Sequence, residues 1–288
     1  MAHCRLVALS KPYDTVDVDT AEELIAYCAR VSNPANQNNK KTAAKLIKYL
    51  IENEHWSPLE MVSMTIEINT TRDIARQILR HRSFSFQEFS QRYAEVVDFS
   101  SPREARLQDK KNRQNSIEHD NDDLTELWNN SQQVTMDLAA GTYKAALAEG
   151  IAKEQARAVL PEGLTNSTLY MAGTLRSWIH YCQLRMANGT QKEHAEIAEL
   201  CWAIISEHFP AISGIFQKDP IDLLIEKFSE ALEAKLRASE DKYEWNDGFQ
   251  NPHWEESLRT ELRKHVSKGD PLDVAAYCAF AHYHGWKI

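Results

Sequence analysis

The first seventy residues combine short apolar runs with amphipathic stretches, a pattern typical of mixed α and β structure. The apolar run at residues 6–9 predicts a short buried strand. Thr20 and Glu23 have the spacing of a capping box, in which each side chain satisfies a free backbone N–H, so we expect a helix to begin there and to end near Asn33. Apolar side chains at the 3.6-residue period predict a second helix over residues 42–53.

A change of period marks the clearest strand in the chain. Between residues 62 and 69 apolar and polar side chains alternate, which is the two-residue repeat of a half-buried strand. Thr71 is then expected to cap a short helix that leads the chain to residues 80–82. The polar residues 100–123 predict a surface loop.

The second half of the chain is predicted to be mainly helical. Helices are expected at residues 124–149, 166–187 and 192–208. Prolines and a glycine within residues 209–220 indicate a domain boundary. Beyond it, an amphipathic stripe from Ile221 to Leu236 and a turn at residues 245–248 indicate a small helical appendage.

These elements predict an α/β (α+β) fold, with an antiparallel sheet flanked by helices. We expect one main domain over residues 1–215 and a helical C-terminal extension of unknown role over residues 216–288. The content of apolar residues, 43%, and of charged residues, 26%, is that of a chain that folds into a globular core.

Charge and cysteine usage narrow the classes of partner. The net charge of −9 disfavours broad binding to nucleic acids or anionic membranes, so any phosphate must be met by a local basic pocket. A nucleic-acid-binding role for the basic run 110–113 is the alternative that this charge disfavours. The five cysteines stand singly, which suits reduced thiols. Because we find no signal-peptide core and no long apolar window, we expect the protein to act in the cytoplasm, without a membrane partner.

Residues 80–93 hold the densest cluster of candidate functional side chains. Within this segment, three arginines and a histidine are interleaved with hydroxyl groups and aromatic rings. Guanidinium groups bind phosphate oxygens in pairs, and aromatic rings can cover a base or a flavin. From charge alone, a solvated basic helix end explains the cluster equally well.

The order of the residues favours the binding interpretation. Arg80-His81-Arg82, followed after seven residues by Ser90, resembles the signature of the flavin-dependent thymidylate synthases. The resemblance extends from about residue 4 to about residue 210.

Further blocks outside the signature are also similar to this family. They are Ala29-Arg-Val-Ser32, Glu54-His-Trp-Ser-Pro-Leu-Glu60, Ala156-Arg-Ala-Val-Leu-Pro161 and the segment from Leu175 to Arg185. Two positions depart from the family pattern, since Ser83 and Thr174 stand where other members carry an apolar residue and an asparagine.

The resemblance implies an enzyme that reductively methylates dUMP to dTMP. It implies FAD as the cofactor, methylenetetrahydrofolate as the carbon donor and NADPH as the reductant, with homotetramers that share active sites between subunits. Carried over by position, it places around dUMP the residues Gln77, Arg80, Glu88, Ser90, Gln91, Arg92, Arg157 and Arg185. It places around FAD the residues Ser32, His55, Ser57, Glu60, Arg80, His81, Arg82, Gln87, Arg176 and His180.

Arg185 is the candidate catalytic residue. A cation beside N3 of uracil and its carbonyl oxygens stabilises the negative charge that makes C5 nucleophilic. Arg176 and His180 lie one helical turn apart and share a face, whereas Arg185 points away from that face if the helix is regular. We interpret Ser90 as a base-positioning hydroxyl, because the sequence arranges no base beside it.

Nucleophilic cysteine and metal chemistry are both disfavoured. Cys28, Cys182 and Cys201 fall within predicted helices and are expected to be small core residues. No metal site is predicted, because the two-residue spacing of His282 and His284 does not share a helix face.

The C-terminal extension lies outside the resemblance. Residues 268–286 look similar to a helical tail found on phage-encoded proteins, which favours a phage origin and, in that case, the host cytoplasm as the place of action. The alternative function is a non-catalytic flavin or nucleotide-binding homologue. The presence of Arg80, Arg92, Arg157 and Arg185 together argues against it.

Overall fold

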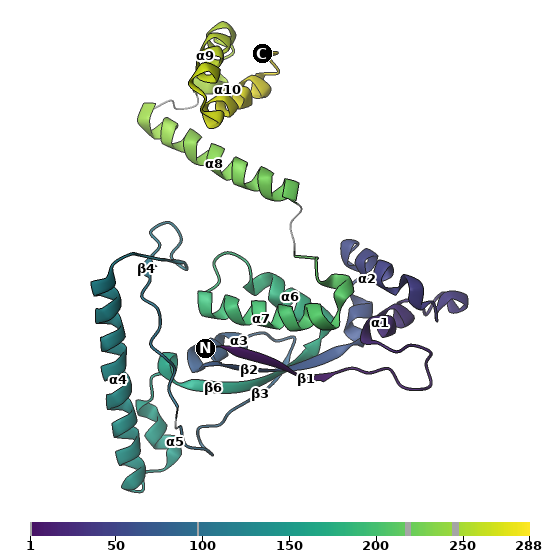
Figure 1. Ribbon diagram of the computed structural model, residues 1–288, viewed down its shortest axis with the longest axis vertical. Helices are drawn as coiled ribbons and strands as arrows, with labels where there is room; N and C mark the ends of the chain where they lie inside the picture. Colours follow the sequence, from purple (N-terminus) through teal and green to yellow (C-terminus); the bar gives the residue numbers. More distant parts are fainter. Residues whose placement is uncertain (1, 97, 217–219, 244–247) are drawn as a thin grey trace. The chain divides into compact units, whose positions relative to one another are not determined.

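The computed structural model describes residues 2–96, 98–216, 220–243 and 248–288, and it divides the chain into two compact units, Met1–Phe216 and Gln217–Ile288 (Figure 1). Residues 217–219 of the predicted boundary and residues 245–247 of the predicted turn lie outside the described residues.

An antiparallel sheet forms the centre of the first unit, as the sequence predicts. Its strand order is β1 (His3–Leu9), β2 (Ser63–Thr71), β6 (Asn166–Thr174) and β3 (Ser85–Glu88). The long strands β2 and β6 pair along their whole length, from Ser63 opposite Thr174 to Thr71 opposite Asn166. A small hairpin of β4 (Leu107–Gln108) and β5 (Ser116–Ile117) lies within the predicted surface loop.

The helix predicted to begin at Asn166 is wrong in its first part. Residues 166–174 form the strand β6, and the helix α6 (Leu175–Arg185) begins only afterwards. Ser167, Leu169 and Met171 are buried, and the residues between them are more exposed, so this segment has the two-residue period of a strand. Pairing with β2 on one side and β3 on the other decides its conformation, and those partners are distant in sequence.

The other predicted helices of the first unit are present. Thr71 stands at the N-cap position of the helix Arg72–Ile78, but its side chain makes no capping hydrogen bond, and the short helix Lys153–Ala156 was not predicted. The predicted capping box of Thr20 and Glu23 is present, although its helix already ends at Ala29 rather than near Asn33. The α-helices before and after the sheet strands are α1 (Ala21–Ala29), α2 (Ala43–Glu52), α3 (Arg72–Ile78), α4 (Asp122–Ala148), α5 (Lys153–Ala156) and α7 (Lys192–His208).

The core is formed by the sheet and the helices α1, α2, α3, α6 and α7. Met64, Ile66 and Ile68 supply the buried face of β2. The Trp178 indole on α6 is fully buried and donates a hydrogen bond to the backbone oxygen of Met64, at 3.2 Å. Burial of a ring of this size contributes strongly to stability and fixes α6 on the sheet. Cys182 and Cys201 are buried as predicted, and Cys28 is half-buried.

The second unit is helical and has its own core. It contains α8 (Pro220–Tyr243), the short η7 (Gly248–Gln250), α9 (Glu255–Lys268) and α10 (Pro271–His284). Its buried residues Leu258, Ala276, Phe280 and Ala281 are packed by apolar side chains from α8 and from the segment around η7. The aromatic rings of this cluster come from η7, from Trp254 just before α9 and from α10 with Trp286 behind it, all within the second unit, as expected for the core of a separate domain.

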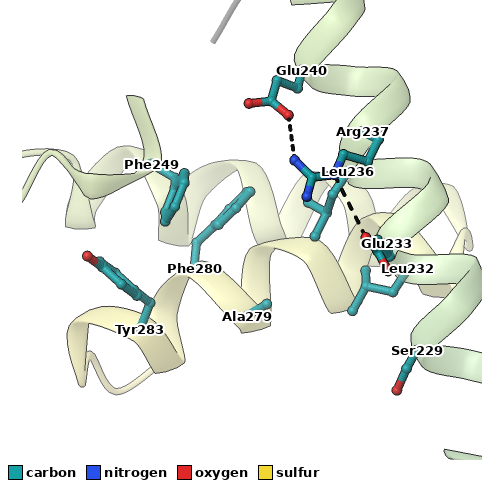
Figure 2. Close-up of a pocket in the computed structure, with 10 residues that line it drawn as sticks. All are labelled: Ser229, Leu232, Glu233, Leu236, Arg237, Glu240, Phe249, Ala279, Phe280 and Tyr283. Carbon is teal, nitrogen blue, oxygen red and sulfur yellow. Dashed lines mark hydrogen bonds and ion pairs between the residues drawn. The ribbon is translucent and has the colours of Figure 1, made fainter. Parts of the chain in front are cut away.

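A cavity of about 560 Å³ lies between α8, η7 and α10 (Figure 2). Leu232, Phe249 and Phe280 form part of its wall, and Arg237 contacts Glu233 and Glu240 at its edge.

Of the two histidines of α10, His284 makes structural contacts and His282 is exposed. The Nε2 atom of His284 lies 2.7 Å from the backbone oxygen of Phe249, and its ring stacks on Trp286. Across the described parts of the chain there is no group of three or more His, Cys, Asp or Glu side chains that could hold a metal ion. None of the described helices has the length and apolar composition needed to cross a membrane.

Candidate active site

The signature loop is anchored on the sheet by Phe84. This loop runs from the end of α3 at Ile78 to the start of β3 at Ser85. A Cβ atom on Gly173 of β6 would lie 2.4 Å from Cδ1 of Phe84, so the ring packs directly against the strand backbone. The same ring meets Trp178 edge to face, with centroids 4.9 Å apart. Phe84 therefore fixes the loop that carries Arg80, His81 and Arg82.

His81 and Arg185 meet at the end of α6. The Nε–H of Arg185 donates to Nε2 of His81 at 3.0 Å, and the His81 ring also packs edge to face on Tyr181. Burial first, and then the positive charges of Arg185 and Arg80, lower the pKa of His81 to about 4. His81 is therefore neutral at pH 7. A predicted flavin residue and the predicted catalytic residue thus lie in direct contact.

Gln77 lies in a polar chain that runs from α3 to α7. Its Nε2 donates to Oε1 of Gln191 at 2.8 Å, and its Oε1 lies 3.3 Å from Nδ1 of His194. His194 is fully buried, and its Nε2 lies 3.2 Å from the hydroxyl of Tyr181. Tyr181 is also in contact with His81, so the chain ends beside Arg185.

Two further predicted dUMP residues, Gln91 and Arg157, line a cavity on another side of α3. This cavity has a volume of about 370 Å³ and is also lined by Arg72 and Arg76. Arg76 and Gln77 are adjacent in sequence, so they point about 100° apart around the helix axis. This difference separates the cavity from the polar chain around Gln77.

Glu88 and Arg92 contact residues that line this cavity, and Ser90 lies between them in the chain. Glu88 accepts a hydrogen bond from Oγ of Ser167 at 2.8 Å and lies 3.5 Å from Nη1 of Arg72. Arg92 is exposed and faces Glu154 at 3.5 Å. The backbone oxygen of Ser90 accepts from the amides of residues 93 and 94, which closes a turn.

Three of the predicted flavin residues meet around the start of α6. Arg176 donates to Glu60 at 2.5 Å, and Glu60 belongs to the 3₁₀ helix η3 (Ser57–Met61). The ring of His180 packs edge to face on Trp56, with centroids 4.5 Å apart. Burial, followed by the charge of Arg176, lowers the pKa of His180.

The two departures from the family pattern lie at this same place. Thr174 caps α6, because its hydroxyl accepts a hydrogen bond from the amide of Ser177 at 3.3 Å. A threonine can fill this capping role in place of an asparagine. The backbone oxygen of Ser83 accepts from the hydroxyl of Ser177 at 3.3 Å, which ties the signature loop to α6.

The other predicted flavin residues are spread around this group. Ser32 lines a cavity of about 460 Å³ that also includes Tyr49, and the ring of His55 lies edge to face on Tyr49. Ser57 is the first residue of η3, beside Glu60. Arg82 and Gln87 are exposed, and Gln87 points to the opposite face of β3 from Glu88.

Several residues of these groups escaped the sequence interpretation, namely Arg72, Arg76, Tyr181, Gln191 and His194. Arg72 and Arg76 are spaced by four residues, which places them on one face of α3, so this spacing was an available signal. No sequence pattern marks His194 and Gln191 as functional, because their contacts depend on how α7 packs against α3 and α6.

Comparisons with known proteins identify the family that this chain matches. The model of the family described as thymidylate synthase complementing protein (Thy1) matches residues 15–211. A probable flavin-dependent thymidylate synthase of Paramecium bursaria Chlorella virus 1 is 51% identical over 209 residues, which cover 73% of this chain and 96% of the relative. The flavin-dependent thymidylate synthase of Synechocystis sp. is 49% identical over 216 residues, covering 74% of this chain and 98% of the relative.

A solved structure agrees with these sequence relatives. The structure of a UMP/dUMP methylase PolB from Streptomyces cacaoi, bound with 5-Br dUMP, superposes with a TM-score of 0.64 at 27% sequence identity. The match covers 75% of this chain and 94% of PolB.

Proposed function

Because this chain belongs to the thymidylate synthase complementing protein family, we propose that it catalyses the flavin-dependent reductive methylation of dUMP to dTMP. Methylenetetrahydrofolate is the carbon donor, NADPH is the reductant and FAD is the cofactor. The observation that carries the proposal is the contact between Arg185 and His81, which joins the signature loop to α6 within a chain about half identical to named members of the family.

Arg185 is assigned to the chemistry on the uracil ring. Its guanidinium is half-buried, and neutral His81 accepts its Nε–H, so its two terminal nitrogens remain to face a ligand. A positive charge beside N3 and the neighbouring carbonyl oxygens stabilises the negative charge that develops in the ring. Burial strengthens this interaction, because the local dielectric is lower than in water.

The groups on the two sides of α3 are assigned to the nucleotide. Gln77, Arg80 and Arg185 form one group. Glu88, Ser90, Gln91, Arg92 and Arg157 form the other, beside the cavity that Arg72 and Arg76 also line. Guanidinium forks of the second group suit a phosphate, which binds arginine through paired hydrogen bonds.

The residues assigned to FAD have chemistry that fits the cofactor. Arg176 keeps an exposed side chain although it is paired with Glu60, and Arg82 is exposed, so cations are available for a pyrophosphate. The rings of His180 and Trp56 offer a surface for a flat heterocycle. When bound, FAD supplies the reducing equivalents for the methyl group.

We further assign the shared sites to a homotetramer. The distribution of the predicted dUMP residues over two sides of α3 supports this, because a second subunit can then complete each group. Light scattering on the purified protein should give four times the chain mass of 33.0 kDa. A monomer that turns over dUMP would contradict shared sites without contradicting the reaction.

The test of the reaction is tritium release from dUMP labelled at C5. Release is expected only when NADPH, FAD and methylenetetrahydrofolate are all present, and dTMP should form in equal amount. Binding of dUMP without any release would favour a non-catalytic nucleotide-binding homologue. Release that continues without a flavin would refute the flavin dependence.

A further inference from the structure

We infer that the ion pair between Glu193 and Arg106 fixes the orientation of the Gln77 amide, through Gln191, so that Gln77 presents an N–H group to the nucleotide. The inference rests on the proposed function, which makes Gln77 a nucleotide-binding residue. It adds Glu193 and Gln191 as positioning residues, and it states which end of the Gln77 amide meets the ligand.

The chain of hydrogen bonds has a fixed direction that begins at Glu193. An ionised carboxylate can only accept hydrogen bonds. Arg106 donates to its Oε1 atom, and Nε2 of Gln191 donates to its Oε2 atom at 2.9 Å. Since the amide nitrogen of Gln191 is used in this way, its oxygen is the atom that faces Gln77. Gln77 must therefore donate through Nε2, and the distance is 2.8 Å.

The hydrogen bonds of His194 and Tyr181, on the other side of Gln77, agree with this direction. The oxygen of Gln77 lies 3.3 Å from Nδ1 of His194, so Nδ1 carries the proton and donates. Nε2 of His194 is then unprotonated and accepts from the hydroxyl of Tyr181 at 3.2 Å. His194 has no exposed surface, and burial lowers its pKa to about 3. The ring is therefore neutral at pH 7 and carries one proton, the one that these contacts place on Nδ1.

The direction of these hydrogen bonds determines which group Gln77 presents to a ligand. Its Nε2 carries two hydrogens, and Gln191 takes one of them. The second hydrogen remains for a ligand, because Gln77 is only half-buried. A reversed amide would place its oxygen toward the ligand, and that oxygen would repel a phosphate or carbonyl oxygen of the nucleotide. The partner of Gln77 is thus an oxygen atom of the nucleotide, not a donor group.

The alternative is that Glu193 and Gln191 only stabilise the packing of α7. A double-mutant cycle with Gln77 separates the two roles, because residues that act through Gln77 lose their effect once Gln77 is removed. Glu193→Gln replaces the carboxylate with an amide, which can also donate a hydrogen bond. Gln191→Leu interrupts the series of hydrogen bonds but keeps the ion pair of Glu193 and Arg106. Glu196→Gln is the matched control, because it removes an exposed carboxylate from the same helix.

In the FAD-loaded enzyme, Glu193→Gln and Gln191→Leu should each raise the KM for dUMP about five- to tenfold, the loss expected when one hydrogen bond is misdirected. The kcat and the KM for NADPH should stay within about twofold of wild type, and Glu196→Gln should leave all three unchanged. In a Gln77→Ala background, neither variant should raise the KM for dUMP further.

Additive effects in that background would overturn the inference, and so would an unchanged KM for dUMP in a folded Gln191→Leu variant. If Glu193→Gln fails to fold, Gln191→Leu still decides the matter. The proposed function fails in a different way, since wild-type enzyme would then release no tritium from dUMP. Turnover by the wild type together with an additive cycle would refute only the positioning roles.

Discussion

The Nε atom of Arg185 donates a hydrogen bond to Nε2 of His81, and 3.0 Å separates the two nitrogens. The bond joins the last residue of α6 to the loop after α3, 104 positions away in the chain. Since only an unprotonated ring nitrogen can accept, the bond requires neutral His81, in agreement with its lowered pKa. The protein's own contacts therefore hold the guanidinium in position.

Arg185→Ala should lower kcat more than it weakens FAD retention. Loss of one charged group that stabilises developing negative charge costs about 10²- to 10³-fold in kcat. The predicted flavin residues Arg176 and His180 keep their contacts with Glu60 and Trp56, so FAD absorbance after gel filtration should stay near that of wild type. Gln183→Ala, an exposed change on the same helix, is the control. Near-normal turnover of Arg185→Ala would refute the assigned role.

The free energy of unfolding should fall as the pH falls from about 6.5 to about 4, in part because of His81. In this range the unfolded chain binds a proton at His81 and the folded chain does not, so acid favours unfolding; below about 4 the residue adds no further loss. One such histidine contributes a slope of at most about 1.4 kcal/mol per pH unit. Urea unfolding at several pH values should show a flatter curve for His81→Gln than for wild type. An equal slope would mean that His81 does not titrate in this way.

Gly173→Ala should destabilise the protein by about 1–3 kcal/mol, the usual cost of overpacking a core. The added methyl group would lie 2.4 Å from Phe84, which cannot move without leaving its place on Trp178. Gly141→Ala is the opposite control. It lies within α4, has nothing within 4 Å of the added atom, and should stabilise the helix by about 0.5–1 kcal/mol. Urea midpoints measure both changes, and a neutral Gly173→Ala would show that the signature loop is not packed tightly.

Removal of residues 217–288 should leave a folded protein that binds FAD with an affinity within about twofold of the full chain, because separate cores unfold separately. Circular dichroism and a flavin titration check this expectation. Aggregation of the shortened chain would show that the extension contributes to the core of the first unit.

Much of the fold follows from local sequence patterns. The capping box of Thr20, the alternation in β2 and the bounds of α7 were all visible in the order of apolar and polar residues. The strand β6 was not, because its apolar residues also fit a helical period and its conformation depends on partners in β2 and β3. Pairing between distant segments is not encoded in any local window.

The candidate site shows the same limit. The signature residues could be found from their order, and the structure brings His81 to Arg185 and Glu60 to Arg176. The roles of the individual residues stay predictions. His194 was invisible to sequence reasoning, since an isolated histidine in a helix gives no signal of the Tyr181 and Gln77 contacts that tertiary packing creates.

The aromatic cluster of the second unit, with Phe249, Trp254 and Phe280, is complete within its own segment of chain. A unit with its own core is expected to fold without contacts from the rest of the chain. We expect a different domain fused after residue 216 to leave the fold of the first unit intact, because each unit has its own core.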